Sequence, residues 1–330
     1  MIRRRDVPAL LAPLVAGCPN RNARGSIRSA APFASVSYLP ILFARSLGYF
    51  DQEGLAVETE DLSSVTKVME SLVGGSIEIA GGTYEQTIQM NALGRDVTAF
   101  FVLSTRLSQI LVAAPARRDV QRIGDLKTRT VGVTGFGSAT HNLLNFLLLK
   151  NGLKPSDVDV VAIGNGASAI AAMENGRVAA AVMISTAFEV LRSMRPDVIV
   201  LADTRTPEGS TELFGVPRLA ASALMATNFW LSKHPSEARG VTRAVASAAR
   251  WIREHPVEEV YAKLPESLQT PGSDAGKRAL LMMMPAFSVD GRMPSGAPGT
   301  IRDFLRLAVD PSLNVDLANT YTNEYLEANP

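Results

Sequence analysis

The stretch that decides the fold is VGVTGFGSATHNLLNFLLLK, residues 131–150. It predicts a β-strand, a glycine-rich turn and then a helix. A turn of this kind leaves free backbone N–H groups at the start of the helix, and such groups bind negatively charged ligands. The segment therefore predicts either the phosphate loop of a nucleotide enzyme or a site for another small ligand.

The glycines of this turn match neither common nucleotide-binding motif. The dinucleotide motif G-x-G-x-x-G needs a third glycine, and an acidic residue at the end of the next strand. Thr140 stands at the third glycine position after Gly135 and Gly137, and the nearest acid, Asp157, comes before the next predicted strand. A Walker loop needs a lysine beside the turn, and the next lysine is Lys150. The pattern argues against a nucleotide.

Two roles remain open for the hydroxyl groups of this turn. Ser138 and Thr140 can cap the helix with their own side-chain oxygens, which is a structural role. They can also direct their hydroxyl groups to a ligand held at the positive end of the helix dipole.

Strands and helices are predicted to alternate on both sides of this segment. The first unit has predicted strands at 26–31, 55–61, 76–80 and 97–103 and predicted helices at 40–47, 64–73 and 84–93. The second unit has predicted strands at 110–114, 131–133, 158–163 and 178–184 and a helix at 167–174. This order predicts two α/β units built on parallel sheets. Residues 97–103, VTAFFVL, are continuously apolar, which predicts a buried parallel strand.

The C-terminal third is predicted to be helical after one more strand at 219–227. Within residues 236–254 the apolar side chains fall on one face of a helix. Further helices are predicted at 275–283, 301–307 and 316–325.

The composition is that of a soluble globular protein of about two domains. The chain has 330 residues, 46% hydrophobic and 20% charged. With 33 basic and 32 acidic residues the net charge is +1, which gives no sign of a nucleic-acid or membrane-surface partner. His141, His234 and His255 are far apart in sequence, so we expect no metal site and no cofactor.

The N-terminus predicts an export signal. Arg3–Arg5 are basic, Val7–Gly17 are mostly apolar, and Val15-Ala16-Gly17 precedes Cys18, the single cysteine. The segment resembles the lipobox of bacterial lipoproteins, in which the bond before the cysteine is cut and the thiol is acylated. A plain secretory leader and a cytoplasmic start are the alternatives. Residues 1–25 are therefore expected to be a leader and tether, and no disulfide is expected.

Several short stretches of the sequence resemble the motifs of one protein family and follow one another in the same order. The chain resembles the substrate-binding proteins of bacterial ABC importers in the NMT1/THI5-like, SsuA-like branch, which includes nitrate, sulfonate, taurine and thiamine-precursor binding. The stretches are 38–55, 72–80, 124–133, 137–141, 172–178, 229–235 and 251–256.

The chain also departs from that family. Ala179-Ala180-Ala181 stands where an aspartate is frequent, and Ser185-Thr186-Ala187 where an aromatic residue or proline is frequent. The family's pyrimidine-synthesising enzymes use a cysteine-rich motif, which a mature chain without cysteine lacks. The sequence therefore gives no support to that enzymatic activity.

The resemblance implies the α/β, two-lobed type II periplasmic-binding-protein fold. Residues 26–109 with 224–330 are expected to form lobe 1, and residues 110–223 lobe 2. Residues 110–114 and 219–227 are the expected crossings between the lobes. Ligands of such sheets bind beyond the carboxyl ends of the strands. The candidate ligand-binding residues at these ends are Ser37, Tyr38, Ser63, Thr83, Tyr84, Arg106, Gly137, Ser138, Ala139, Thr140, His141 and Ser185.

Arg106 predicts the charge of the ligand. Its guanidinium suits a carboxylate and also binds a sulfonate, whereas a surface ion pair is its alternative role. Tyr38 and Tyr84 are expected to hold an apolar or ring portion between them.

The sequence thus predicts a receptor that binds a small organic anion and delivers it to an ABC permease and its ATPase. A receptor for a neutral heterocycle such as a thiamine pyrimidine precursor is the alternative. An enzyme is less favoured, because the predicted strand ends carry no cluster of His, Cys or carboxylate side chains. We expect a monomer in the periplasm or cell envelope, attached to the membrane only through a lipid on Cys18, with no nucleic-acid partner.

Overall fold

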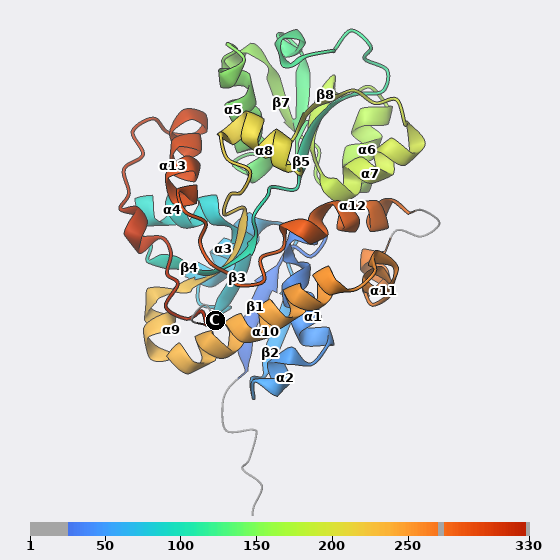
Figure 1. Cartoon of the computed structure of the whole chain (residues 1–330). Coiled ribbons are helices and arrows are strands. Elements are labelled where there is room, and N and C mark those ends of the chain that lie inside the picture. Colours follow the sequence, from blue (N-terminus) through green and yellow to red (C-terminus); the bar gives the residue numbers. More distant parts are fainter. Residues whose placement is uncertain (1–25, 270–273, 328–330) are drawn as a thin grey trace, which may run out of the picture.

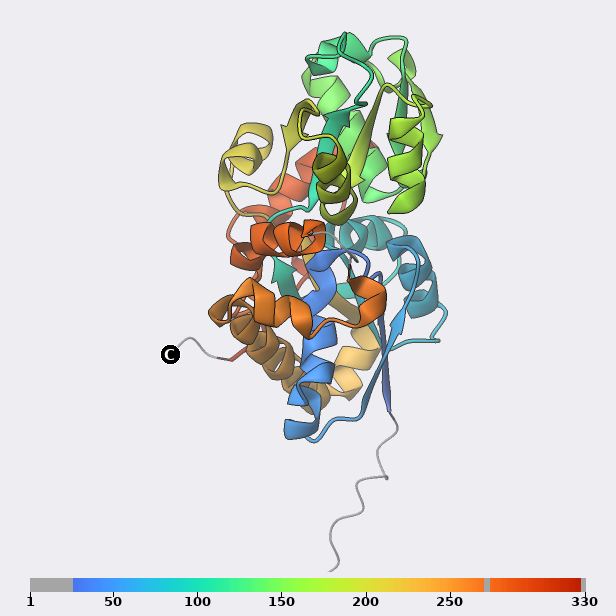
Figure 2. The ribbon, with the colours of Figure 1, turned by 90° about the vertical axis from the view of Figure 1, so that its right-hand side faces the viewer.

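Two five-stranded sheets, each covered by helices, form the two lobes of the protein (Figure 1). The computed structural model describes residues 26–269 and 274–327. The predicted leader, Cys18 included, lies outside the described residues. The lobes stack one above the other, as Figures 1 and 2 show, and they confirm the predicted two-lobed α/β class.

Lobe 1 is built on a sheet with the strand order β2-β1-β3-β10-β4. Strand β1 pairs in parallel with β2 and β3, whereas β10 is antiparallel to both of its neighbours. The strands are β1 (Ile27–Ala31), β2 (Val57–Asp61), β3 (Ile79–Thr83), β4 (Val97–Ser104) and β10 (Ser222–Thr227).

Lobe 2 repeats this arrangement with the order β7-β6-β8-β5-β9. Strand β6 is parallel to β7 and β8, and β5 is antiparallel to β8 and β9. In both sheets the strand that arrives from the other lobe takes the fourth place and runs antiparallel. The strands are β5 (Gln109–Ala113), β6 (Thr130–Val133), β7 (Asp159–Ala162), β8 (Ala180–Ile184) and β9 (Val200–Asp203).

The crossings lie beside the predicted segments. Residues 110–114 and 219–227 fall mostly in β5 and β10, inside the sheets, so the predicted crossings are wrong. The chain passes between the lobes at residues 105–108 and 215–221. The apolar strand β5 pairs inside the buried sheet of lobe 2. The more polar residues 105–108, which precede it, make the first connection between the lobes. The predicted lobe boundaries at 110 and 224 consequently fall within β5 and β10.

Strand β4 is buried along its whole length, as predicted, but its neighbour is the antiparallel β10. The parallel pairing expected for residues 97–103 is therefore wrong. The other edge of β4 is covered by isolated bridges from Ala99 to Tyr321 and from Ser104 to Phe287. The C-terminal tail is thus drawn into extended pairing, and the predicted helix at 316–325 shortens to a 3-10 turn at Leu317–Asn319.

Helices cover the faces of both sheets. Those of lobe 1 are α1 (Leu39–Ser46), α2 (Tyr49–Gln52), α3 (Val65–Val73) and α4 (Tyr84–Ala92). Those of lobe 2 are α5 (Ala139–Lys150), α6 (Ala167–Glu174), α7 (Ser185–Met194) and α8 (Pro207–Phe214). The C-terminal helices are α9 (Asn228–Lys233), α10 (Pro235–Glu254), α11 (Val257–Ala262), α12 (Ala275–Met283) and α13 (Ala297–Ala308). Within the described part of the chain, no helix is long and apolar enough to span a membrane.

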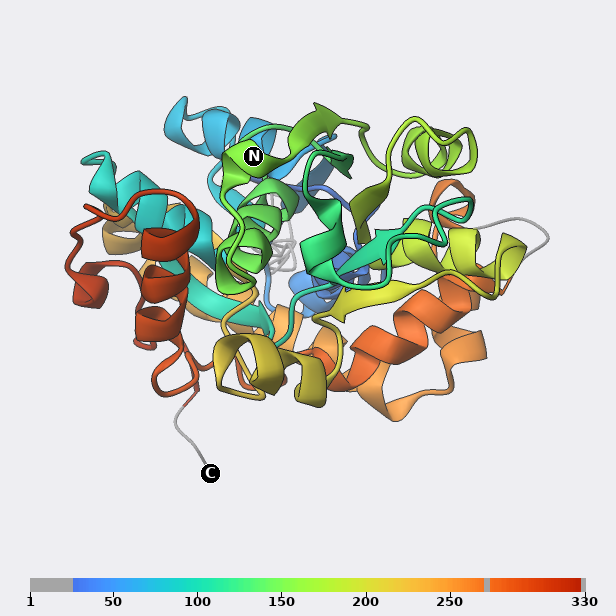
Figure 3. The same ribbon diagram turned by 90° about the horizontal axis from the view of Figure 1, so that it is seen from above.

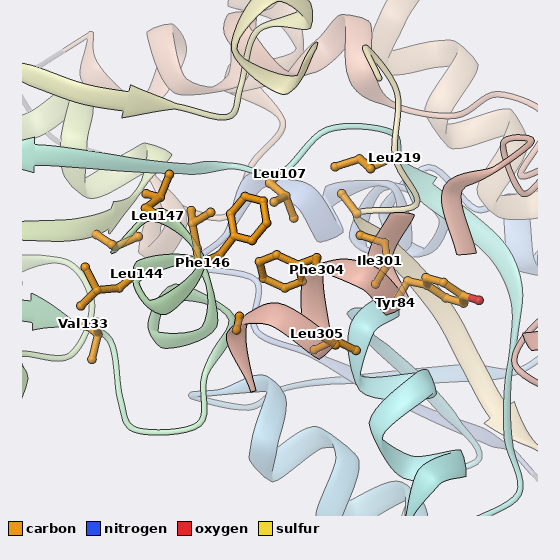
Figure 4. Close-up of a cluster of buried hydrophobic side chains, with 14 of the residues drawn as sticks. Tyr84, Leu107, Val133, Leu144, Phe146, Leu147, Leu219, Ile301, Phe304 and Leu305 are labelled. Carbon is orange, nitrogen blue, oxygen red and sulfur yellow. The ribbon is translucent and has the colours of Figure 1, made fainter. Parts of the chain in front are cut away.

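Two C-terminal helices contact lobe 2 as well as lobe 1. Helix α12 packs against α7, and α13 packs against α5 and α4. Seen from above, α12 and α13 lie on different sides of lobe 2 (Figure 3). Phe304 of α13 packs against Phe146 of lobe 2, with ring centroids 5.0 Å apart (Figure 4). It also packs against Phe214 of lobe 2, with ring centroids 5.9 Å apart. A continuous apolar cluster therefore joins the two lobes.

Candidate ligand-binding cleft

A cleft between the lobes contains about 760 Å³ of empty space, part of it open to solvent. It lies at the carboxyl ends of the strands, where ligands of α/β sheets bind. Lobe 1 contributes the segments after β1, β2 and β3, and lobe 2 those after β6, β7 and β8. The side of the cleft at the crossings is formed by residues 106–108 and Ala221 of the crossings, together with Gln109 and Ser222, which begin β5 and β10.

The lining is rich in hydroxyl groups and has little charge. Half of the residues that line the cleft are serine or threonine. Arg106 is the charged residue among them, and no aspartate or glutamate of the described chain lines the cleft. A neutral, hydrogen-bonding wall with one cation favours a polar ligand that is either neutral or negatively charged.

Helix α5 begins at the wall of the cleft and is braced by its own turn. The Ser138 hydroxyl accepts a 3.4 Å hydrogen bond from the His141 N–H and donates one of 2.7 Å to the Gly135 carbonyl. The hydroxyl groups of Thr134 and Thr140 lie 2.8 Å apart. The structural capping role is therefore present.

Two backbone donors of this turn remain for a ligand. The N–H groups of Ala139 and Thr140 have no hydrogen-bond partner among the described residues. Both residues line the cleft at the positive end of the helix dipole. A ligand can thus bind here through the backbone while the side chains hold the turn in shape.

Arg106 lines the cleft from the first crossing and is 7% exposed, and it also lines a second pocket beside Pro207 and Arg218. Its Nη1 donates a 2.8 Å hydrogen bond to the carbonyl oxygen of Arg205. Among the described residues no carboxylate lies within 4 Å of it, so the predicted alternative of a surface ion pair does not hold. Burial lowers the pKa of Arg106, and the more distant Glu208 acts in the opposite direction. The cleft thus contains a buried cation that lacks a close counter-ion.

Glu85 lies behind the cleft wall and connects the lobes. It accepts a 3.0 Å hydrogen bond from Asn142, and both side chains are buried. Burial raises the pKa of Glu85 to about 7, while the hydrogen bond from Asn142 lowers it. Burial and the nearby Glu85 together raise the pKa of Tyr38, whose ring lines the cleft.

The sequence model of the family described as NMT1/THI5 like matches residues 35–259. The chain belongs to this family. Its fold is that of the periplasmic binding proteins, which are among the similar solved structures. The predicted family resemblance is thereby confirmed.

Three proteins show what this NMT1/THI5-like chain is similar to. The 4-amino-5-hydroxymethyl-2-methylpyrimidine phosphate synthase of Schizosaccharomyces pombe is 24% identical over 89% of this chain and 83% of its own. A Bordetella bronchiseptica RB50 protein of known structure is 30% identical, with a TM-score of 0.84 over 92% and 96% of the two chains. The alkanesulfonate-binding protein SsuA of Xanthomonas axonopodis pv. citri, bound to MOPS, is 18% identical, with a TM-score of 0.73 over 90% and 98%.

The cleft of this NMT1/THI5-like chain brings together most of the candidate residues. Those that line it are Ser37, Tyr38, Ser63, Thr83, Arg106, Ser138, Ala139 and Thr140. Gly137 and His141 are beside the lining; the His141 Nδ1 accepts a 3.0 Å hydrogen bond from the Gly137 N–H, and burial lowers the pKa of His141. This bond holds the two residues together within the turn.

Two other candidates lie in the protein interior. The Tyr84 hydroxyl is 2.5 Å from the Thr320 hydroxyl and the side chain is fully buried, so Tyr38 and Tyr84 do not form the expected pair around a ring. Ser185 is also buried and accepts a 3.3 Å hydrogen bond from Arg205. Helix packing, which the sequence pattern does not specify, turns both side chains away from the cleft.

Sequence reasoning missed several polar residues of the cleft. Gln86 follows the predicted Tyr84 by two positions, and Gln109 follows Arg106 by three. The other missed polar lining residues are Ser35, Thr66, Ser108, Thr134, Asn165 and Ser222. The sequence does indicate Gln86 and Gln109 as candidates, because both lie next to the end of a strand and a side-chain amide there can bind a ligand.

Proposed function

We propose that the chain is the solute-binding receptor of an ABC importer and binds a small organic anion, a carboxylate or a sulfonate, between its lobes. The receptor delivers the ligand to a permease and its ATPase. It acts in the periplasm or cell envelope as a monomer, anchored through an acylated Cys18. The observation that carries the proposal is Arg106, a buried cation at the cleft without a carboxylate partner.

The two lobes offer complementary contacts to an anion. Arg106 at the hinge provides a planar guanidinium with donors in a fixed fork. The start of α5 in lobe 2 provides the free N–H groups of Ala139 and Thr140. An anion that contacts both would hold the lobes closed, because each contact is lost when the lobes separate. Similarity to a protein named for alkanesulfonate binding supports the same ligand class.

A receptor for a neutral heterocycle is the second candidate. The family relative named as a pyrimidine phosphate synthase and the many hydroxyl groups of the cleft favour it. An enzyme that makes such a pyrimidine is less supported, because no His, Cys, Asp or Glu lines the described cleft. Acid–base or nucleophilic catalysis needs such a group within hydrogen-bond reach of the substrate.

Binding to matched acids and amides tests the charge of the ligand. Thermal shift with a library of organic acids, each paired with its neutral amide, identifies binders, and calorimetry measures their Kd. Charge-assisted hydrogen bonds contribute about 1.5–3 kcal/mol. We therefore expect Arg106→Met to weaken the best acid by about 10- to 150-fold.

Arg177→Met is the matched control, because Arg177 is exposed on lobe 2 and does not line the cleft. This variant should bind like the unaltered protein. Equal affinity for acid and amide, together with normal binding by Arg106→Met, would exclude the anion.

A further inference from the structure

The cleft contains three buried polar atoms that lack a hydrogen-bond partner among the residues the structure describes. They are Thr83 Oγ1, Gln86 Oε1 and Gln109 Oε1, and the three side chains are 8%, 6% and 7% exposed. All three residues line the cleft. A buried polar atom without a partner is unfavourable, and most such atoms in proteins are paired. Their grouping around one cavity points to a ligand that these side chains reach by rotation, because the three atoms are closed to solvent as placed.

The two amides come from different lobes. Gln86 lies in the first turn of α4 in lobe 1, whereas Gln109 begins β5 in lobe 2. Rotation about the last side-chain torsion exchanges the carbonyl and NH₂ ends of each amide, so either end can turn to a ligand. A ligand group that contacts both amides would bridge the two lobes.

The backbone holds both amides in place. Thr204 accepts a 3.2 Å hydrogen bond from the Gln109 N–H and donates one of 2.7 Å to the Gln109 carbonyl. On α4, the two residues before Gln86 are fixed by their bonds to Thr320 and Asn142. The backbone that carries each amide is thus fixed, while the amide groups themselves remain able to turn to a ligand.

The absence of an acidic lining residue restricts the ligand further. An ammonium group placed between the amides would have no carboxylate of the described cleft to pair with. The nearby Glu85 is turned to Asn142, and burial favours its neutral form. A neutral donor such as a hydroxyl or a carboxamide avoids the cost of burying an unpaired cation.

We infer that the ligand is an organic acid that also carries a neutral hydrogen-bonding group, a hydroxyl or a carboxamide, held by Gln86 and Gln109. This inference rests on the proposed function, since Arg106 binds the acid. It excludes both plain alkyl acids and zwitterionic amino acids as the preferred ligands.

Two matched series of probes test the inference in calorimetry. The first is pentanoate, 5-hydroxypentanoate, 5-aminopentanoate and 5-hydroxypentanamide. The second is benzoate, 4-carbamoylbenzoate, 4-(aminomethyl)benzoate and terephthalamide. In at least one series the acid with the neutral group should bind ten times more tightly than the plain acid and the ammonium acid.

The outcomes separate the inference from the proposed function. A plain acid that binds as tightly as its hydroxyl or carboxamide partner overturns the inference and leaves the anion receptor intact. A neutral amide that binds as tightly as the acid overturns the anion receptor. An ammonium acid that binds best overturns the exclusion of zwitterions, and no binding in either series at 1 mM counts against the inference.

Variants of the amides provide the second test. Gln86→Met and Gln109→Met keep the side-chain size and remove the hydrogen bonds. Each should abolish the tenfold preference, leave the affinity for the plain acid unchanged, and keep or raise Tm, because an unpartnered buried amide is removed. Gln89→Met on the same helix, outside the cleft, is the control. Lower Tm with equal loss of affinity for every probe would assign the amides a structural role and overturn the inference.

Discussion

Glu85 of α4 accepts a 3.0 Å hydrogen bond from Asn142 of α5, and this buried contact joins lobe 1 to lobe 2. The contact requires the lobes to lie together, so it stabilises the closed arrangement. Burial raises the pKa of the carboxyl group to about 7. The strength of the connection between the lobes therefore depends on pH near neutrality.

We predict that stability falls as pH rises through this range because of Glu85. Its pKa is raised from 4.5 to about 7, so between these values the folded state binds more protons than the unfolded chain. The cost begins above pH 4.5 and is complete above pH 7, where it reaches about 3 kcal/mol at most. Glu85→Gln keeps the acceptor for Asn142 and removes the charge, so it should flatten the curve and be more stable at pH 8. Denaturation from pH 4.5 to 8 measures this, and parallel curves for the two proteins would contradict it.

We predict that Arg278→Met favours the open form of the free protein. Arg278 of α12 lies 3.3 Å from a carboxylate oxygen of Glu189 on α7, and it also donates to the Glu189 carbonyl. The arginine is partly exposed, so its loss should change the free energy of unfolding by less than about 1 kcal/mol. Solution scattering should show a larger radius of gyration without ligand and the original radius with it. An unchanged radius without ligand would assign α12 no part in closure.

We predict that Arg205→Met is strongly destabilising. Arg205 is fully buried and pairs with Glu189 at 2.8 Å and Asp203 at 2.7 Å. Removal of the cation leaves Glu189 buried without its main partner, and such a loss costs about 3–5 kcal/mol. Arg192→Met is the control, because Arg192 is half exposed and 3.8 Å from the same carboxylate. Urea denaturation should separate the two variants, and similar midpoints would show that the buried pair contributes little.

The topology of the site could be predicted from the sequence, but the direction of individual side chains could not. Strand ends follow from the alternation of apolar and polar segments, and these ends placed Ser63, Arg106 and Ser138 at the cleft. On a helix, however, one residue along the chain turns a side chain by about 100°. The choice between Tyr84 and Gln86 therefore depends on how α4 packs.

That packing involves distant parts of the chain. Tyr84 is turned inward by Thr320, which is 236 residues away in sequence. Ser185 is turned to Arg205 by a buried ion-pair network that no local pattern indicates. The predicted bounds of α6 and α12 agree with the structure, because their apolar faces and terminal residues are local signals.

The two roles of Ser138 can be separated by two substitutions. Ser138→Ala removes the cap of α5, which costs about 1 kcal/mol of stability. Its effect on binding of an acid should stay below about tenfold, because the N–H groups of Ala139 and Thr140 remain. Ser138→Asp keeps a capping oxygen, so Tm should be preserved.

The aspartate would place a negative charge in the cleft, whose lining otherwise includes no acidic residue of the described chain. An anionic ligand is repelled by that charge and should bind more than about 100-fold more weakly, since like charges brought together across a binding site cost several kcal/mol. A neutral ligand should lose far less. Calorimetry with a matched acid and amide measures the difference. If Ser138→Asp folds normally and binds the acid with unchanged affinity, the anionic group of the ligand does not lie at the start of α5.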